Sequence, residues 1–226
     1  MLLLYLIRRI YMKDNYINNC FQKILDANLY DVVLKTPLEY AHNISKRLKN
    51  DVYIKREDLQ PIFSFKLRGA YNKISRLSTK KSVKKLVAAS AGNHAQGVAL
   101  SGKKLSIPVC IVMPKTTPQI KITAVDALNA HVILHGDTYD DAYDYARKIS
   151  QKKGYEFIHP YDDIEVIAGQ GTIAKEILEQ IDKKPDYIFI PVGGGGLLAG
   201  ISVYVKKVSP KTKIISVEPY DSNCFY

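Results

Sequence analysis

The strongest constraint on the fold is a regular alternation, from about residue 36 onward, of short apolar runs with longer amphipathic stretches. The apolar runs are rich in Val and Ile and predict buried strands at 51–55, 85–90, 108–114, 131–136, 155–160, 186–192 and 213–219. Helical patterns separate them at 66–77, 94–103, 118–129, 138–153, 172–181 and 197–207. Such alternation predicts an α/β fold of open, mostly parallel sheet with crossover helices on both faces.

Length and charge limit the size of the protein and its partners. The 226 residues are 46% hydrophobic, enough for one large domain or two small ones. A formal net charge of +11 is compatible with a nucleic-acid partner. The basic residues are scattered, however, and their densest cluster, "TKKSVKK" at Thr79–Lys85, lacks interleaved aromatic residues. We therefore expect no nucleic acid as a partner.

The cysteines and the N-terminus indicate a cytoplasmic setting. Cys20, Cys110 and Cys224 are few, far apart and odd in number, which argues against a disulfide framework or a zinc site, and Cys110 lies in a predicted core strand. The apolar run that opens "MLLLYLIRRIYMK" is too short to span a bilayer. Its arginines follow the apolar run, whereas a secretory signal places its basic residues first. Residues 1–35 are expected to be an extension or helix, with no membrane partner.

Ligands of open parallel sheets bind beyond the carboxyl ends of the strands, and three strand ends here carry unusual residues. The first is "PVGGGGLLAG" at Pro191–Gly200, where four glycines join a strand to a helix. Backbone without Cβ atoms can wrap closely around a ligand, and the free N–H groups of the helix start bind anions. A flexible turn is the alternative interpretation. A Walker loop is excluded, because no Gly-Lys-Ser/Thr follows the glycines. A dinucleotide site is the weaker interpretation: Glu218 would suit a ribose, but the third glycine of G-x-G-x-x-G is missing.

The second strand end is "SAGNHAQG" at Ser90–Gly97. Ser90, Gly92 and Asn93 make a loop of exposed amides and short polar side chains, which suits a carboxylate. Asn93 also offers an amide donor toward a ring substituent. His94 could be a base or a metal ligand, but it has no ligand partner at a suitable spacing, so we expect a structural role and no metal.

The third feature is "SFKLRGAYNKI" at Ser64–Ile74, which places Lys66 at the start of a predicted helix. In one interpretation Lys66 points into water. In the other, burial beside Phe65 and the helix N-terminus both favour a neutral, nucleophilic amine, as an imine-forming lysine requires. A reactive lysine, a carboxylate loop and a phosphate cradle together indicate pyridoxal phosphate, a small phosphate-bearing aldehyde.

Four segments carry a resemblance to a known family. "KREDLQPIFSFKLRGAYNKI", "ASAGNHAQGVA", "VIAGQGT" and "PVGGGGLLAGI" closely resemble the biosynthetic threonine dehydratases, which belong to the tryptophan-synthase-β-like, fold type II group of pyridoxal-phosphate enzymes. The resemblance runs from about Thr36 to the end of the chain. It implies two domains with the cofactor between them: a large domain of residues 36–74 and 156–226, incomplete at its C-terminus, and a small mobile domain of residues 75–155.

The resemblance also implies roles for individual residues. Lys66 resembles the lysine that binds the cofactor covalently, and Phe65 the aromatic residue beside it. Asn93 corresponds to the residue that bonds the cofactor's ring hydroxyl. The phosphate-binding loop is matched by Gly193, Gly194, Gly195, Gly196 and Leu197. The loop that holds the substrate carboxylate is matched by Ser90, Ala91, Gly92, Asn93 and His94.

The implied activity is the conversion of L-threonine to 2-oxobutanoate and ammonia, the first committed step of isoleucine biosynthesis, in a homo-oligomer that is a homotetramer by resemblance. The alternatives are a catabolic serine/threonine dehydratase, a serine racemase, with L-serine as a further substrate, or an inactive truncated remnant. The chain ends before the family's pyridine-nitrogen partner and regulatory domain would appear, so it resembles a fragment.

Overall fold

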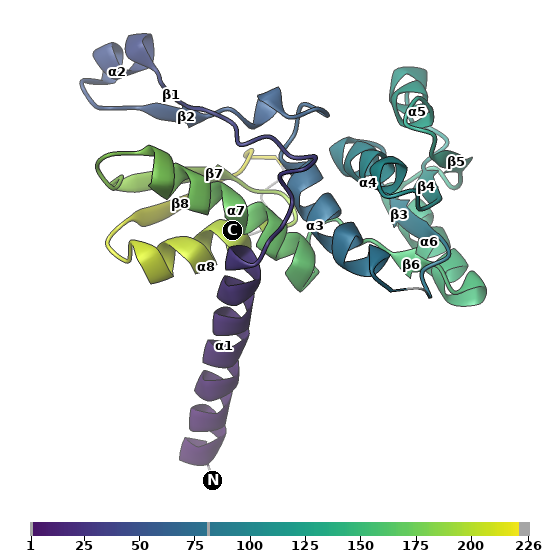
Figure 1. Ribbon diagram of the computed structural model, residues 1–226, viewed down its shortest axis with the longest axis horizontal. Coiled ribbons are helices and arrows are strands. Elements are labelled where there is room, and N and C mark those ends of the chain that lie inside the picture. Colours follow the sequence, from purple (N-terminus) through teal and green to yellow (C-terminus); the bar gives the residue numbers. More distant parts are fainter. Residues whose placement is uncertain (1, 81, 222–226) are drawn as a thin grey trace.

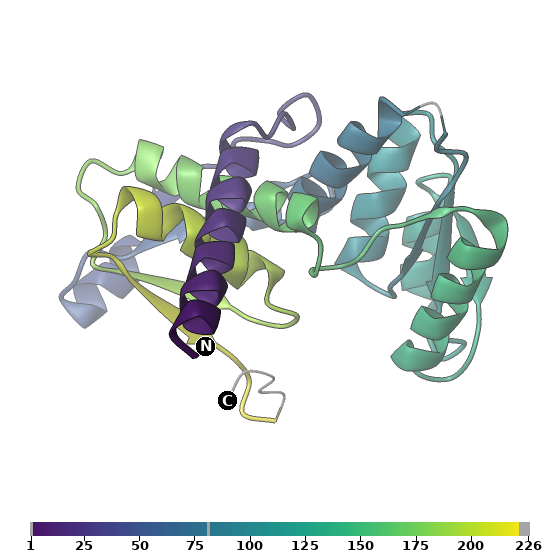
Figure 2. The same cartoon turned by 90° about the horizontal axis from the view of Figure 1, so that it is seen from below.

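The computed structural model describes the backbone of residues 2–80 and 82–221 and the side chains of residues 14–80 and 82–221. Cys224 lies outside the described residues. The chain forms two lobes joined by helix α3 (Lys66–Ser78), as Figure 1 shows. The same two lobes stand side by side in the perpendicular view of Figure 2.

The smaller lobe is built on a four-stranded parallel sheet with the order β5-β4-β3-β6. Its strands are β3 (Leu86–Ala89), β4 (Val109–Met113), β5 (His131–Leu134) and β6 (Glu156–Phe157). Helices α4 (Asn93–Lys104), α5 (Gln119–Asp126) and α6 (Tyr139–Lys153) connect them. β3 and β4 are buried throughout, as continuous apolar runs in a parallel sheet require.

Alternate residues of these strands enter two separate cores. Leu86, Ala88 and Ile111 face α3 and α4, together with Ile74 and Val98. On the opposite face, Val87, Cys110 and Val112 pack against Ala142, Ala146 and Ile149 of α6. The prediction of an α/β fold with parallel sheet covered by helices on both faces is confirmed, as is the assignment of Cys110 to the core.

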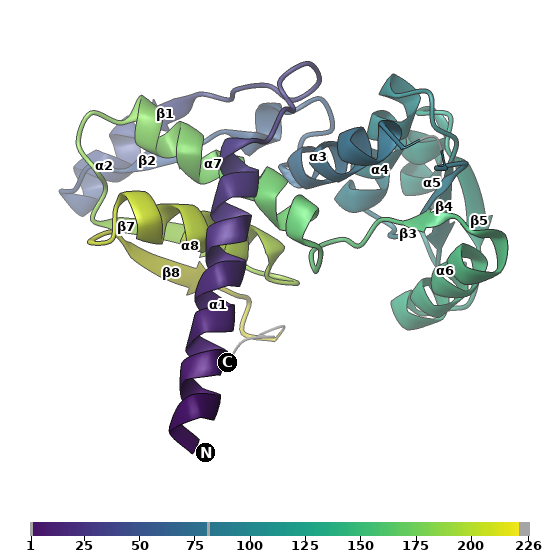
Figure 3. The ribbon, with the colours of Figure 1, turned by 60° about the horizontal axis from the view of Figure 1, so that its bottom comes forward.

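The larger lobe contains two separate two-stranded sheets. β7 (Tyr187–Pro191) and β8 (Lys213–Val217) are parallel, whereas β1 (Leu38–Tyr40) and β2 (Tyr53–Lys55) are antiparallel. The helices of this lobe are α1 (Leu2–Leu25), α2 (His42–Leu48), η1 (Glu57–Leu59), α7 (Ile164–Gln180) and α8 (Gly196–Val208). α1 lies across α7 and α8, where Cys20 and Ile24 enter their shared core (Figure 3).

Three parts of this arrangement differ from the sequence prediction. The strand predicted at 51–55 pairs in an antiparallel sheet with β1, which was not predicted, and neither was α2. α7 begins eight residues before the predicted start, because the Asp163 carboxylate caps it by accepting from the backbone N–H groups of Glu165 (2.8 Å) and Val166 (3.3 Å). β6 pairs with β3, so the sheet of the smaller lobe continues past residue 155, where the proposed domain boundary lies.

Within the described part of the chain, no helix is long and apolar enough to cross a membrane. α1 carries Lys23 in its last turn and leads into the loop that enters β1. The predicted extension of residues 1–35 therefore contains a long helix, and its C-terminal end is packed on the larger lobe through Cys20 and Ile24.

Candidate active site

Lys66 is the first residue of α3, and its half-buried side chain lines a cavity. Its Nζ donates a hydrogen bond to the carbonyl oxygen of Pro160 at 2.8 Å and lies 5.7 Å from the centre of the Phe65 ring. Among the side chains that the structure describes, no carboxylate offsets the loss of water around the amine, and this burial lowers the pKa of Lys66 to about 8. The Lys66 amine thus points toward the Pro160 carbonyl and the cavity, which favours the interpretation of a desolvated amine over that of a lysine in open water.

The glycine-rich segment faces the same space as Lys66. β7 ends at Pro191 and α8 begins at Gly196, so the four glycines form the turn between strand and helix. Their turn and Leu197 line a cavity of about 90 Å³ together with Phe65 and Lys66. The backbone N–H groups of the first turn of α8 have no acceptor within the helix, and they carry the positive end of its dipole. The cavity thus combines an amine with an anion-binding helix start.

The four glycines are needed for different reasons. Gly195 has φ of 84°, a left-handed conformation that disfavours residues with a Cβ. A Cβ on Gly194 would lie 2.1 Å from Cδ1 of Tyr161, and one on Gly196 would lie 2.9 Å from the Tyr161 carbonyl oxygen. A Cβ built on Gly193, by contrast, has no atom of the described residues within 4 Å. Gly193 is therefore the glycine of the turn that leaves room for a ligand.

Tyr161 was not predicted as a site residue. It belongs to a turn after β6 in which His159 Nδ1 accepts from the N–H groups of Tyr161 (3.3 Å) and Asp162 (2.8 Å). The same turn supplies the Pro160 carbonyl to Lys66 and the Tyr161 ring to Gly194. It therefore holds the reactive amine and the glycine turn at a fixed separation. The sequence does carry one indication of this turn: "HPYDD", a loop that contains Pro and Asp and follows a predicted strand, where ligands of parallel sheets bind.

Gln170 is a second lining residue without a predicted role. It lies in α7 within "VIAGQGT", is buried, and accepts at Oε1 from the backbone N–H of Gly69 at 3.2 Å. Gly69 and Gly169 allow α3 and α7 to approach closely, because a Cβ on Gly169 would lie 2.5 Å from the Arg68 carbonyl oxygen. This close crossing places the start of α3, and hence Lys66, beside the cavity.

The Ser90–His94 loop lies at the end of β3 and at the start of α4, but it does not line the cavity between Lys66 and the glycine turn as that cavity is formed by the described residues. Ser90 Oγ accepts from the Gly92 N–H at 3.2 Å, which shapes the loop. A Cβ on Gly97 would lie 3.2 Å from the Lys66 carbonyl oxygen. Asn93, which is exposed, stands one helical turn before Gly97 and therefore at the Lys66 side of α4.

His94 is buried, and its Nε2 donates to the Ile158 carbonyl oxygen at 3.0 Å, because a carbonyl can only accept. Burial, with the Lys66 charge, lowers the pKa of His94 to about 3, so the ring is neutral at physiological pH. The side chain thus fixes the loop to the 158–160 segment. Among residues 14–80 and 82–221, no group of three or more His, Cys, Asp or Glu side chains is placed to hold a metal ion.

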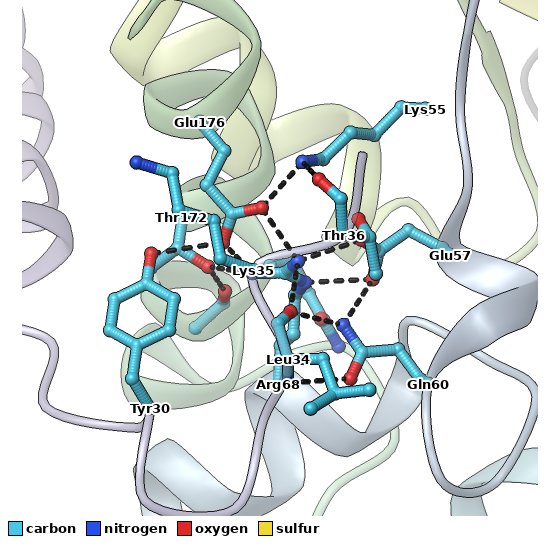
Figure 4. A network of polar contacts seen from close by, with 12 residues as sticks. Tyr30, Leu34, Lys35, Thr36, Lys55, Glu57, Gln60, Arg68, Thr172 and Glu176 are labelled. Carbon is cyan, nitrogen blue, oxygen red and sulfur yellow. Dashed lines mark hydrogen bonds and ion pairs between the residues drawn. The ribbon is translucent and has the colours of Figure 1, made fainter. Parts of the chain in front are cut away.

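Arg68, two residues after Lys66, is fully buried in a charge network (Figure 4). Its guanidinium donates to both carboxylate oxygens of Glu57, each at 2.7 Å, and to both of Glu176, at 2.6 and 3.0 Å. Lys55 Nζ adds a second cation at 2.5 Å from Glu176. Two cations and two carboxylates balance, so the network ties α3 to η1, β2 and α7 without an unpaired charge. No role was predicted for these residues from the sequence.

Together, the fold and the cavity define a class of protein: an α/β enzyme in which a buried amine faces an anion-binding helix start. An aldehyde with an anionic tail fits this arrangement, since the amine can attack the carbonyl while the helix start binds the anion.

Comparison with known proteins agrees with a site for an aldehyde that has an anionic tail. A family model described as "Pyridoxal-phosphate dependent enzyme" matches residues 29–226. The chain belongs to this family.

The individual relatives are threonine dehydratases. The chain is 54% identical over 200 residues to the chloroplastic biosynthetic threonine dehydratase of Arabidopsis thaliana, covering 88% of this chain and 34% of that protein. It is 49% identical over 202 residues to the biosynthetic L-threonine dehydratase of Bacillus subtilis, covering 88% of this chain and 48% of that one. This chain therefore spans between one third and one half of these relatives.

Solved structures show the same fold. The processed form of threonine deaminase isoform 2 from Solanum lycopersicum superposes with a TM-score of 0.87 at 52% identity, covering 91% of this chain and 56% of that chain. Maize serine racemase superposes with a TM-score of 0.84 at 32% identity, covering 88% of this chain and 61% of the other. The resemblance to biosynthetic threonine dehydratases within the fold type II group is confirmed.

Proposed function

We propose that this chain carries the cofactor-binding part of a biosynthetic threonine dehydratase, which converts L-threonine to 2-oxobutanoate and ammonia in the pathway to isoleucine. The observation that carries the proposal is the buried Lys66 amine facing the helix start after the tetraglycine turn, in a chain about 50% identical to threonine dehydratases. Because the chain spans only part of these relatives, the activity is assigned to the protein in which the rest of the fold is also present.

The residues present suit pyridoxal phosphate. When bound, this cofactor supplies an aldehyde that condenses with amines and a conjugated ring that draws electron density from a substrate carbon. Lys66 Nζ would hold its aldehyde end, and the N–H groups from Gly193 to Leu197 would hold its phosphate. We assign the ring hydroxyl to Asn93, at the Lys66 side of α4, and the ring contact beside the lysine to Phe65.

Lys66 also has a second role in the proposal. With threonine held in its place, the free Lys66 amine would accept the proton from the substrate Cα, and the β-hydroxyl would take up a proton and leave as water. Hydrolysis of the dehydrated product would then give 2-oxobutanoate and ammonia. A pKa of about 8 suits this task, since the amine can take up and release a proton near neutral pH. The hydrogen bond that Nζ donates to the Pro160 carbonyl orients the lone pair of the amine. A freely rotating lysine on the surface has no such fixed orientation.

The substrate carboxylate is assigned to Ser90, Ala91, Gly92, Asn93 and His94. The amides of this loop end at a helix start, whereas the His94 side chain is committed to Ile158, so His94 would contribute through its backbone. We propose that residues 75–155, together with strand β6, which belongs to the same sheet, move as a small domain relative to the remaining residues of the larger lobe, because the loop would have to reach a substrate held at Lys66. We further assign the protein to the cytoplasm as a homotetramer, with neither nucleic acid nor membrane as a partner.

The cofactor assignment is tested on the purified 226-residue chain. After incubation with pyridoxal phosphate and borohydride reduction, peptide mass spectrometry should find a pyridoxyl group on Lys66. Lys66→Ala should remove this label. Lys73→Ala, on the same helix, should retain it, since Lys73 pairs with Asp163 away from the cavity. Labelling spread evenly over exposed lysines would contradict the assignment.

The reaction is tested on a chimera in which the part of the tomato enzyme that has no counterpart here is joined to this chain. We expect 2-oxobutanoate from L-threonine, abolished by Lys66→Ala and kept by Lys73→Ala. Serine racemase is the second candidate, because the maize enzyme has the same fold at 32% identity. Chiral analysis with L-serine separates the two: D-serine as the main product would favour the racemase, and pyruvate the dehydratase.

A further inference from the structure

The segment of residues 158–163 crosses from the smaller lobe to the larger lobe, between the end of β6 and the start of α7 (Figure 3). We call it the crossing segment. Two neighbouring residues in its middle contact the two functional parts of the cavity. The Pro160 carbonyl oxygen accepts from Lys66 Nζ at 2.8 Å, and the Tyr161 ring packs against Gly194. The backbone conformation of the crossing segment therefore sets the separation between the amine and the glycine turn.

His159 holds this conformation from within the crossing segment. Its Nδ1 accepts from the backbone N–H of Asp162 at 2.8 Å and from that of Tyr161 at 3.3 Å. An N–H group can only donate, so Nδ1 must carry a lone pair. The ring is therefore neutral, with its proton on Nε2. A charged ring would present an N–H at Nδ1 and would lose both hydrogen bonds.

The surroundings of His159 favour this neutral form. Burial is the largest cause of its lowered pKa, and the positive charges of Arg147 on α6 and of Lys66 on α3 act in the same direction. The carboxylates of Asp162 and Asp163 act in the opposite direction without reversing the shift. The lone pair on Nδ1 is thus available to the two N–H groups at neutral pH.

The chain uses the same arrangement a second time, four residues later. Asp163 Oδ1 accepts from the N–H groups of Glu165 at 2.8 Å and of Val166 at 3.3 Å. These donors lie two and three residues ahead of their acceptor, as they do for His159. Both acceptor atoms are attached to Cγ, so the side-chain oxygen of Asp or Asn reaches the same backbone groups as Nδ1 of histidine. Histidine supplies this acceptor without a negative charge.

We propose that His159 is a positioning residue for pyridoxal phosphate: by accepting the two N–H groups, it fixes the distance between the Lys66 amine and the glycine turn. The inference rests on the proposed cofactor and does not require the proposed reaction. A ligand that binds at both ends gains affinity from the second contact only when the two sites lie at the right separation. Loss of the acceptor should therefore weaken a ligand that spans both sites much more than a ligand that occupies one of them.

The first experiment measures amide hydrogen exchange, residue by residue, on the 226-residue chain without cofactor. His159→Phe keeps an aromatic ring next to Tyr143 and Phe157, which pack edge-on against His159, but it has no acceptor. His159→Asn keeps an acceptor and lacks the ring. Exchange at Tyr161 and Asp162 should be at least tenfold faster in His159→Phe than in the wild type. In His159→Asn it should stay within threefold of the wild type.

The amides of Glu165 and Val166 are the matched control, because Asp163 holds them in the same pattern. Their exchange should change less than threefold in both variants. Equal acceleration at these control amides would overturn the inference, because the substitution would then loosen the whole region. Exchange at Tyr161 that is unchanged in His159→Phe would also overturn it, because the ring would not hold the crossing segment.

The second experiment compares three ligands: pyridoxal phosphate, inorganic phosphate, and 5-deoxypyridoxal, which has the aldehyde and the ring but no phosphate. Borohydride trapping at Lys66 measures the affinity for the two aldehydes, and calorimetric titration measures the affinity for phosphate. In His159→Phe the dissociation constant for pyridoxal phosphate should rise at least tenfold, and those for the other two ligands less than threefold. All three should stay within threefold in His159→Asn. The same holds for His135→Phe, which replaces a half-buried histidine stacked on Tyr145 in the smaller lobe.

The pattern across the variants decides the role of His159. A smaller loss of affinity for pyridoxal phosphate in His159→Phe, or a larger loss in His159→Asn, would refute positioning by the acceptor. An equal loss for all three ligands would refute it as well, since both sites and not their separation would then be damaged. A wild-type chain without a pyridoxyl label on Lys66 would overturn the proposed cofactor and this inference together. A labelled wild type with the same affinity in His159→Phe would overturn this inference alone.

Discussion

The reactivity of Lys66 can be worked out from its surroundings before any cofactor is added. With a pKa of about 8, roughly one tenth of Lys66 amines are neutral at pH 7. An ordinary lysine with a pKa near 10.5 is neutral in only about 0.03% of molecules at that pH. The neutral fraction at Lys66 is therefore about 300 times larger, and only the neutral amine attacks an aldehyde.

Short pulses of deuterated formaldehyde and cyanoborohydride on the cofactor-free chain, read by peptide mass spectrometry, measure this difference. Between pH 6 and 10, the initial rate at Lys66 should rise about tenfold per pH unit and level off above about pH 8. A free lysine derivative added to the same reaction has the ordinary side-chain pKa near 10.5, so its rate should continue to rise toward pH 10, and it provides the control. The pH at which the rate levels off is the measure, because the walls of the cavity slow the reagent equally at every pH.

Two outcomes would refute the reasoning. A rate at Lys66 that is still rising tenfold per unit at pH 10 would mean that the ammonium form is solvated, so burial against Phe65 and Pro160 does not lower its pKa. Levelling at the same pH for Lys66 and the added lysine derivative would mean that the reagent, not the protein, sets the profile.

Three further predictions concern stability. Gly194→Ala should destabilise the chain by about 1–3 kcal/mol in urea unfolding, because its Cβ would overlap the Tyr161 ring. Gly193→Ala should leave the unfolding free energy unchanged and weaken phosphate binding, which a phosphate titration measures. Arg68→Ala should cost about 3–5 kcal/mol in urea unfolding, since it leaves buried carboxylates short of a cation, while Arg56→Ala at an exposed ion pair should barely move the midpoint. The pKa of His94 is about 3 in the folded chain and 6.5 in the unfolded chain, so below about pH 6.5 only the unfolded chain binds the extra proton. The free energy of unfolding therefore falls as the pH drops from 6.5 toward 3. Between pH 7 and 5 the wild type should lose about 2 kcal/mol more than His94→Gln.

The sequence predicts the smaller lobe well, for a physical reason. Its strands are buried on both faces, so their apolar runs are continuous and easily distinguished from the helices around them. The start of α7 was missed because "IEVIAG" is rich in β-branched residues and does not resemble a helix opening, although Asp163 caps it. β1 and α2 are short, and their pairing depends on tertiary contacts rather than on local pattern.

The candidate site divides in the same way. Lys66 and the tetraglycine turn follow strand or helix boundaries that the sequence shows, and the structure places both on one cavity. The Pro160 carbonyl is 94 residues from Lys66 along the chain and is a backbone group, so no side-chain pattern marks it. Arg68 and Glu176 have the residue types of a solvated surface, and only the fold shows that they are buried together.

The turn from Gly193 to Gly196 shows why a run of identical residues has no single explanation. Gly195 is required by its own backbone conformation, and Gly194 and Gly196 by the packing of Tyr161. These three glycines would be needed even if no ligand bound here. Their presence is therefore explained by the Tyr161 contact and by the backbone at the start of the helix, and it does not indicate a ligand. Gly193 is different, because neither its conformation nor any neighbour excludes a side chain. Gly193 also lines the cavity, so the case for an anion at this turn depends on the open space beside Gly193 together with the free N–H groups at the start of α8.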